Sequence, residues 1–600
     1  MRAQVAPRAP RSPRRRWLRR TAGLAFLILL CIGGWLGISG YRAYAELSAA
    51  KDHLEAAKQA LLRADSATAQ GEVDLAVDNA AAARGNTSTV LWDVVAAVPG
   101  VGQPFDAAAK ISAAVDELAV QVLRPAASAG AALAPDTLRG ADGAINLDAL
   151  VSARAPLQHA ATAAARLSAT VNAIPSGGYV DTVEAAREQL QVQTRELVGL
   201  LNTATDAATI VPPMLGSDGP RTYFFAFQTN AEARGTGGLL GSFAILRTDH
   251  GHVSVVKMGS GSNADLVDQG SNPVNLGPEF AQQGYIGNST TAWGNSNISA
   301  NFPYVAQIWA SLWQLQSGQR VDGVMATDPV ALAYLLDVVG GLTLPDGQFV
   351  DGDNFVQITE SEIYEKFPGL DGADRDARKV YEQGISGELV QKIIGDSGGH
   401  TVDLLRALGK AAAEGRLDLW SALPDEQAVL DPTPLGHEVP DDSAPYAGLV
   451  VNNSSHGKLD YYLGRAVNYT AGGCGQPNRQ STVAATLTNN APPQGLPTFV
   501  TIGSPPGPVG TNRSDVTLYA TAGAQLTAVT VNGVPAAAKP GTERGHPVFT
   551  INVEIPPGAA VVMIFVLTEP TAAGRARVPI QPLVLPMDVT TDVPVCGAGG

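Results

Sequence analysis

Two side chains of opposite charge, Glu232 and Arg234, stand two residues apart in the glycine-rich segment 228–242. An arginine can hold phosphate oxygens through two parallel hydrogen bonds, and glycines let backbone amides come close to an anion. The segment therefore predicts an anion pocket. A glycine-rich turn that joins two strands for steric reasons only is the alternative. The ligand-binding candidates in this segment are Asn230, Arg234, Gly237, Gly238 and Ser242.

The elements on either side of this segment read as strands. The apolar run from Tyr223 to Phe227 precedes it and the run from Phe243 to Leu246 follows it. Short apolar runs that end at glycines are typical of buried strands. We therefore expect the candidate residues on a loop between two strands.

Several classes of enzyme are poorly supported. No spacing of cysteines and histidines is typical of a zinc site, and no serine lies in a Gly-x-Ser-x-Gly turn. None of the eight histidines stands in a convincing triad. Hydrolysis by serine, cysteine or zinc is not predicted.

The first forty residues predict a membrane segment. Eight arginines lie within residues 1–20, and the uncharged stretch 21–40 follows them directly. About twenty apolar residues suffice to cross a bilayer as a helix, with the basic end on the cytoplasmic side. We expect a basic cytoplasmic tail (1–20), a transmembrane helix (21–40) and the bulk of the chain outside the membrane. A cleaved signal peptide is the alternative.

The charge balance excludes nucleic acid as a partner. The formal net charge is -15, and outside the first twenty residues only 33 of the 41 Lys and Arg remain against 56 Asp and Glu. Such an acidic surface repels phosphate backbones.

Three further regions follow the predicted membrane segment. Residues 41–211 are rich in alanine with apolar residues at helical intervals, which predicts a helical bundle or stalk that can self-associate. Residues 212–445 mix strands and helices in an α/β domain, where Asp328 before Pro329 is expected to cap a helix. Residues 446–600 carry short strands and the hairpin signal Asn532-Gly533, which predicts a β-sandwich. The predicted fold class is α+β multidomain.

Two cysteines flank the predicted sandwich. Cys474 and Cys596 are suited to a disulfide outside the cell, and two free thiols are the alternative.

Several ordered blocks of the chain resemble the DUF4012 family. They are Leu91 to Gly102, Asn230 to Ser242, Val321 to Pro329 and Val451 to Tyr462. The family occurs mainly in bacterial envelopes, often beside exopolysaccharide genes, and its activity is not established. The resemblance implies a context in the cell envelope and no particular chemistry.

The central region also resembles, more remotely, the LytR-CpsA-Psr transferases, which move glycopolymers from a polyprenyl-pyrophosphate carrier to the cell wall. The resemblance rests on Arg234 with the hairpin 242–257, on the strand and helix 322–342, and on the helix start 374–379. It implies that Arg234, Arg375 and Arg378 hold phosphates. The chain departs from the family's pattern at 258–263, where those enzymes have an Arg-Asp pair.

Carboxylates near that gap are the candidates for catalysis. Glu232 and Asp265 are the predicted catalytic residues, and Asp265 and Asp268 the predicted ligands of Mg²⁺, which would neutralise a pyrophosphate leaving group. The sequence thus predicts an envelope protein that binds, and in the stronger version transfers, a lipid-linked glycan to a cell-wall polymer. A non-catalytic scaffold or a glycan-binding or protein-binding protein of the same architecture is the alternative.

Overall fold

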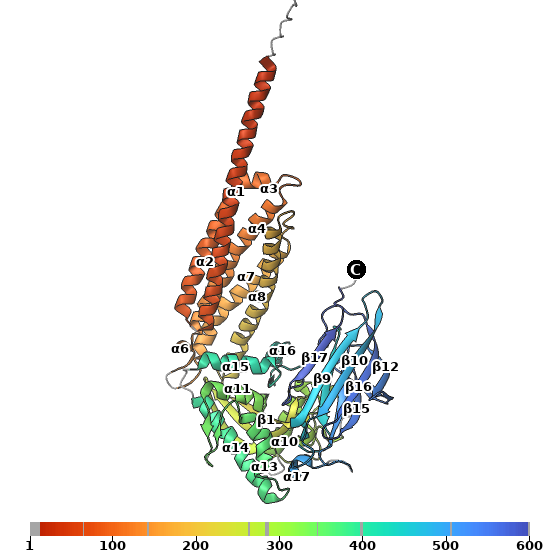
Figure 1. The fold of residues 1–600 in the computed structure, drawn as a ribbon. Coiled ribbons are helices and arrows are strands. Elements are labelled where there is room, and N and C mark those ends of the chain that lie inside the picture. The colour runs from red at the N-terminus through yellow and green to blue at the C-terminus, as the bar shows by residue number, and fades with distance from the viewer. Residues whose placement is uncertain are drawn as a thin grey trace, which may run out of the picture. The chain divides into compact units, whose positions relative to one another are not determined.

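The computed structural model describes residues 13–63, 65–140, 143–261, 265–282, 287–344, 346–395, 400–503 and 507–597. The chain divides into two compact units. One comprises residues 1–138 and 146–212, and the other comprises 139–145 and 213–600. Figure 1 shows the helices and strands of both units. The class is α+β multidomain, as the sequence predicts.

The first unit consists of helices, drawn from red to yellow in Figure 1. Alanines fill most of the contacts between them, and Ala50, Ala80 and Ala160 are completely buried. Small side chains let helices approach closely but bury little apolar surface each. The helices are α1 (Pro13–Leu62), α2 (Ser66–Thr87), α3 (Val90–Ala96), α4 (Gln103–Glu117), the π-helical η1 (Leu118–Leu123), α5 (Arg124–Ala132), α6 (Pro135–Leu138), α7 (Leu147–Asn172) and α8 (Asp181–Met214).

The predicted membrane segment lies in α1. In the part of the chain that the structure describes, no helix is both long and apolar enough to cross a membrane. The side chains of α1 are described from Leu30 onward. The predicted transmembrane helix at 21–40 and the single-pass placement are therefore contradicted. Residues 1–12 of the predicted basic tail lie outside the described residues.

A five-stranded sheet forms the centre of the α/β region, in the order β3-β2-β1-β4-β7. Only β1 and β4 are parallel, and the other neighbours are antiparallel. Aromatic side chains form the core beside the sheet, where Phe224 stacks on Phe243 and Trp293 at 5.3 and 5.5 Å between ring centroids. The strands are β1 (Arg221–Arg234), β2 (Gly237–Asp249), β3 (His252–Ser260), β4 (Gly323–Thr327) and β7 (Leu417–Ser421).

Helices cover this sheet, and short elements connect them. Asp328 caps α11 by accepting a hydrogen bond from the amide of Ala331 at 2.8 Å, which confirms the predicted cap. The elements are α9 (Gly277–Gln282), η2 (Trp293–Asn295), α10 (Phe302–Ser317), α11 (Pro329–Val339), β5 (Leu342–Thr343), β6 (Phe349–Val350), α12 (Phe355–Gln357), the π-helical η3 (Ile358–Glu362), α13 (Ile363–Lys366), α14 (Gly372–Gly395), α15 (Thr401–Ala413) and α16 (Pro424–Leu430).

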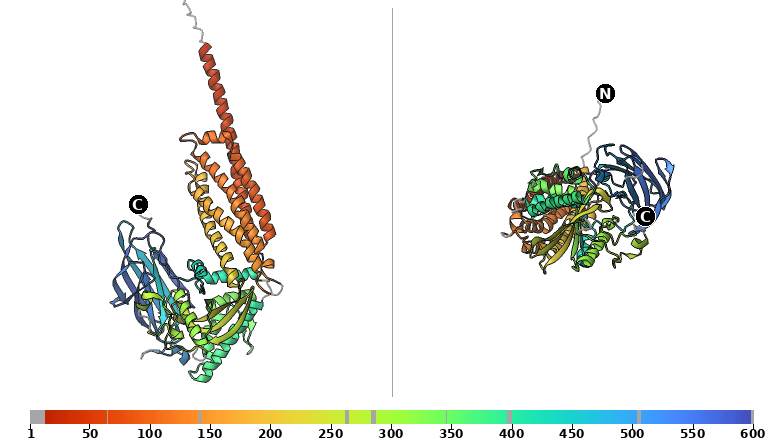
Figure 2. Two further views of the ribbon diagram at one scale, coloured as in Figure 1. Left: turned by 180° about the vertical axis from the view of Figure 1, so that it is seen from behind. Right: turned by 90° about the horizontal axis from the view of Figure 1, so that it is seen from below.

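Two antiparallel-rich sheets pack around a shared core in the C-terminal part, drawn in blue tones in Figures 1 and 2. Side chains alternate between buried and less buried along β10, as a half-buried strand requires. The first sheet holds β8 (Ala447–Asn453), β11 (Asn512–Ala520), β14 (Lys539–Glu543) and β15 (His546–Ile555). The second holds β9 (Leu463–Ala471), β10 (Asn478–Asn489), β12 (Gln525–Val531), β13 (Val534–Pro535), β16 (Ala560–Pro570) and β17 (Met587–Asp592), and the connections include η4 (Leu459–Tyr462) and α17 (Thr498–Thr501).

Two local sequence signals are visible in this part. Asn532 and Gly533 both have positive φ, at 51° and 78°, as a type I′ turn between β12 and β13 requires. Cys474 and Cys596 form a disulfide with their Cα atoms 5.6 Å apart. The bond ties the segment after β17 to the connection between β9 and β10.

The glycine-rich segment is a hairpin and not a loop, because β1 continues to Arg234 and β2 begins at Gly237. A Cβ on Gly235 would lie 2.2 Å from the carbonyl oxygen of Ile298, and one on Gly238 would lie 2.2 Å from that of Thr229. Gly237 has a φ of 128°, which L side chains rarely adopt. Close backbone packing therefore accounts for these glycines without a bound anion.

A pair of glycine substitutions tests this explanation. We expect Gly238→Ala to lower the free energy of unfolding by more than ~2 kcal/mol, because the new Cβ collides with a strand backbone. Gly241→Ala is the matched control, since its Cβ would come no closer than 3.4 Å to another atom. Chemical unfolding of both variants measures the difference. Equal stabilities would contradict a packing role for Gly238.

Candidate functional site

Glu232 and Arg234 form a buried ion pair within the chain. Arg234 Nη2 lies 2.9 Å from Glu232 Oε1, and the other donors of Arg234 reach backbone carbonyls, including that of Gly294 at 3.0 Å. Lys458, which precedes η4, donates to the second oxygen of Glu232. The side chains of all three residues are at most 7% exposed. The hairpin charges are thus satisfied by the chain itself.

Electrostatics keep Glu232 ionised. Burial alone would raise the pKa of its carboxyl, but Lys458 and Arg234 outweigh burial and lower that pKa to about 2. A carboxylate that is ionised and held by two cations is a poor general base. The position of Glu232 therefore gives no support to its predicted catalytic role.

The other predicted carboxylates also have backbone partners. Asp265 accepts a hydrogen bond from the amide of Ser260 at 2.8 Å, and Asp268 accepts one from the amide of Trp293 at 2.9 Å. Among the described residues, no three His, Cys, Asp or Glu side chains come together as a metal ion would need. The residues predicted to bind Mg²⁺ therefore do not form a fitting site for that ion.

Asn230 and Gly237 lie at a contact between the hairpin and the C-terminal part. The amide group of Asn230 donates to the carbonyl of Pro582 at 2.8 Å, and the position of a Cβ on Gly237 would be 3.0 Å from the same oxygen. Both residues hold the hairpin tip against the segment that precedes β17.

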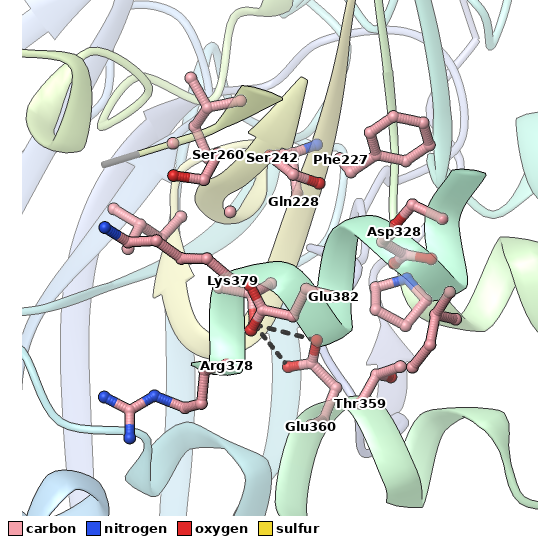
Figure 3. A pocket seen from close by; sticks show the side chains of 18 of the residues that line it. Phe227, Gln228, Ser242, Ser260, Asp328, Thr359, Glu360, Arg378, Lys379 and Glu382 are labelled. Atoms are coloured by element: carbon pink, nitrogen blue, oxygen red, sulfur yellow. Dashed lines mark hydrogen bonds between the residues drawn. The ribbon is translucent and has the colours of Figure 1, made fainter. Parts of the chain in front are cut away.

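A cavity of about 350 Å³ opens beside the hairpin and brings together three of the predicted residues: Ser242, Arg375 and Arg378 (Figure 3). Arg234 lines a different cavity, of about 270 Å³, against the four-stranded sheet of the sandwich. The structure therefore separates Arg234 from the two arginines with which the sequence grouped it.

Basic side chains from two regions line the larger cavity. Arg375, Arg378 and Lys379 come from α14, and Lys458 comes from the sandwich side. Arg378 is only 3% exposed, and its guanidinium lies 3.7 Å from the ring centre of Phe499. One of its terminal nitrogens, Nη1, donates to the carbonyls of Phe367 and Gly369.

The other terminal nitrogen of Arg378, Nη2, is buried without a hydrogen-bond partner in the described chain. Burial lowers the pKa of Arg378, yet a guanidinium stays charged near neutral pH. A buried donor on a charged group that has no partner is costly, by about 1–3 kcal/mol or more. An anion in the cavity would satisfy it.

Besides Asp328, two further carboxyls line the same cavity, and the sequence signalled neither of them. Glu360 on η3 is 2% exposed and accepts hydrogen bonds from the hydroxyl of Thr229 at 2.9 Å and the amide of Ala231 at 2.6 Å. Burial raises the pKa of Glu360 to about 8. Burial also raises the pKa of Glu382, on α14, to about 7.

Sequence spacing could have found one of the two. Glu382 lies four residues after Arg378 and seven after Arg375, so a helix places all three on one face. Glu360 and Lys458 gave no such signal, because their partners Ala231 and Glu232 lie more than a hundred residues away in the sequence. The apolar wall of the cavity is formed by Phe227, Leu239, Leu240, Leu332, Phe355 and Ile385.

The raised pKa of Glu360 predicts how stability depends on pH. Between the ordinary carboxyl pKa of 4.5 and the folded value of about 8, the folded chain holds a proton that the unfolded chain has lost. The contribution of Glu360 to stability therefore falls as pH rises through this window and is constant above it.

We expect Glu360→Gln to remove this fall. The variant should gain stability relative to the parent protein between pH 5 and pH 8.5, on the order of 2–4 kcal/mol, since one pH unit corresponds to about 1.4 kcal/mol. Urea unfolding at the two pH values measures the gain, with Glu388→Gln at an exposed position of α14 as control. A difference between parent and variant that does not change with pH would contradict the buried neutral carboxyl.

Comparisons with known proteins give one family. Residues 218–364 match the family model DUF4012, described as a protein of unknown function. No curated protein matches the chain. A solved structure from Legionella pneumophila subsp. pneumophila, described as a "putative nutrient binding protein", aligns over 21% of this chain and 44% of its own with 12% identity and a TM-score of 0.14, too low to support an argument. The resemblance to the LytR-CpsA-Psr transferases is not confirmed. The hairpin, α11 and Glu360 lie within the matched residues, so the predicted resemblance to the DUF4012 family is confirmed for this region.

Proposed function

We propose that this protein binds an amphiphilic anion in the cavity between the hairpin and α14, namely the phosphate or pyrophosphate of a lipid-linked glycan. The single observation that carries the proposal is the buried, unpartnered Nη2 of Arg378, a residue that lines the cavity. A donor of this kind is explained when a ligand supplies the acceptor.

The charge of the cavity favours an anion. Arg375 and Arg378 have backbone carbonyls as their recorded partners, and neither forms an ion pair with a carboxylate among the described residues. Glu360 is largely neutral at pH 7, because its pKa is about 8. The two guanidinium groups therefore have no directly paired carboxylate and are available for charge-assisted hydrogen bonds to phosphate oxygens.

The opposite wall favours an apolar group. Phe227, Leu239, Leu240 and Leu332 line the cavity together with Phe355 and Ile385. The volume of about 350 Å³ falls within the range of small-molecule sites, which are mostly apolar with a few placed polar groups. A free inorganic phosphate would leave this apolar wall unused, whereas a prenyl chain would cover it.

The proposal is for binding and not for transfer. The two predicted catalytic residues do not supply the base or the metal ion that transfer needs at the reacting bond. Glu232 is held by Arg234 and Lys458, and Asp265 by the amide of Ser260. Neither residue lines the cavity.

A binding measurement tests the proposal. Calorimetry with farnesyl pyrophosphate on the full chain should show binding, and Arg375→Ala should weaken it about tenfold, because one charge-assisted hydrogen bond contributes about 1.5–3 kcal/mol. Arg375 is exposed, so its removal should leave the fold intact. Arg513→Ala on the sandwich is the matched control, since that arginine pairs with Glu554 away from the cavity.

Two results would oppose the proposal. If the parent protein and Arg375→Ala bind farnesyl pyrophosphate with equal affinity, the arginines do not hold the phosphates. If inorganic pyrophosphate binds as tightly as farnesyl pyrophosphate, the apolar wall does not contribute to binding.

A further inference from the structure

Glu382 is a cavity residue whose carboxyl has no hydrogen bond or ion pair among the described residues. It lies one helical turn after Arg378 on α14 and is partly buried. Figure 3 shows its side chain at the cavity, near those of Glu360, Arg378 and Lys379. Glu360 differs from it, because the hairpin already supplies two donors to that carboxyl.

The basic side chains around Glu382 contact other groups of the chain. Lys458 is paired with Glu232, and Lys379 lies 3.5 Å from Asp376. Arg378 donates to backbone carbonyls and stacks on Phe499. Glu382 is thus an acceptor without a donor, in the same cavity as a guanidinium with a donor that lacks an acceptor.

These two unmet requirements describe one ligand. Arg378 lacks an acceptor, which a phosphate oxygen would supply. Glu382, on the next turn of the same helix, lacks a hydrogen-bond donor, which a group close to that phosphate would supply. A hydroxyl group of a sugar attached to the phosphate meets the second requirement, whereas a bare prenyl phosphate does not.

We propose that Glu382 is the residue that makes the cavity specific for a glycosyl phosphate, by hydrogen bonding to a sugar hydroxyl next to the phosphate that the arginines hold. This inference rests on the proposed function. It adds which chemical group, beyond the anion, the site recognises.

The state of the carboxyl favours a hydroxyl over an ammonium group. Burial raises the pKa of Glu382, while Lys458, Arg378 and Lys379 lower it, and the result is about 7. Glu360 also faces this cluster, and Glu382 in turn helps to raise its pKa. Near neutral pH the Glu382 carboxyl is therefore less readily ionised than an ordinary glutamate. A carboxyl in this state is suited to hydrogen bonding with a neutral hydroxyl more than to pairing with a cation.

The experiment compares three probes on the full chain by calorimetry at pH 7. They are farnesyl pyrophosphate, the same molecule with N-acetylglucosamine on its outer phosphate, and lysophosphatidylethanolamine, which carries an ammonium group near its phosphate. We expect the sugar-bearing probe to bind about tenfold more tightly than farnesyl pyrophosphate, which corresponds to about 1.4 kcal/mol.

Variants assign this difference to one side chain. Glu382→Ala should remove the tenfold preference and leave the affinity for farnesyl pyrophosphate within a factor of about two. Glu382→Gln keeps an acceptor of the same shape and should keep most of the preference. Glu388→Ala, on the exposed face of the same helix, is the control and should change neither affinity.

The outcomes separate this inference from the proposed function. If farnesyl pyrophosphate binds but the sugar adds nothing, or if Glu382→Ala weakens both probes equally, the specificity role is overturned while the anion site stands. Tighter binding of lysophosphatidylethanolamine than of the sugar-bearing probe also overturns it. If none of the probes binds, the proposed function itself fails.

Discussion

The buried ion pairs of Glu232 with Arg234 and Lys458 are the interaction on which the rest of the second unit, residues 139–145 and 213–600, depends. They join the tip of the hairpin, at the end of β1, to the chain segment that enters the sandwich. Removal of one partner from such a group leaves a buried charge and typically costs 3–5 kcal/mol. The backbone of Arg234 adds to the same junction, because its carbonyl accepts a hydrogen bond from Gln581 at 2.6 Å. The α/β region and the sandwich are thereby held in one compact unit, and Lys458 is placed in the cavity wall.

The overhang of β1 explains why carboxylates are buried around the hairpin. β1 pairs with β4 only as far as Phe227, so the amides beyond that residue have no strand partner on that side. Glu360 accepts from the amide of Ala231, and Asp460 accepts from that of Ala233 at 2.8 Å. Buried backbone amides require acceptors, and here two side chains take the place of a neighbouring strand. The fold therefore explains Glu360 but not Glu382 in the same cavity, and of these two carboxyls only Glu382 is assigned a ligand contact.

Local sequence patterns were enough to predict most of the fold. The site could not be predicted in the same way, because its residues have partners far away in the sequence. The apolar runs beside the hairpin, the cap at Asp328 and the turn at Asn532 depend on neighbours within a few residues, and the structure has all three. The partner of Glu232 is 226 positions away, so spacing could not show that the hairpin charges are satisfied internally. The same limit applies to glycines: their sequence suits an anion nest and a tight backbone contact equally, and only the position of the Thr229 and Ile298 carbonyls distinguishes the two.

A crystal structure of the full chain with farnesyl pyrophosphate tests the central claim most directly, because it locates the phosphates relative to both sets of arginines. We expect pyrophosphate oxygens within hydrogen-bond distance of Arg378, the prenyl chain against Phe227 and Leu332, and an unchanged ion pair between Arg234 and Glu232. Pyrophosphate bound at Arg234, with Glu232 displaced from it, would contradict the account.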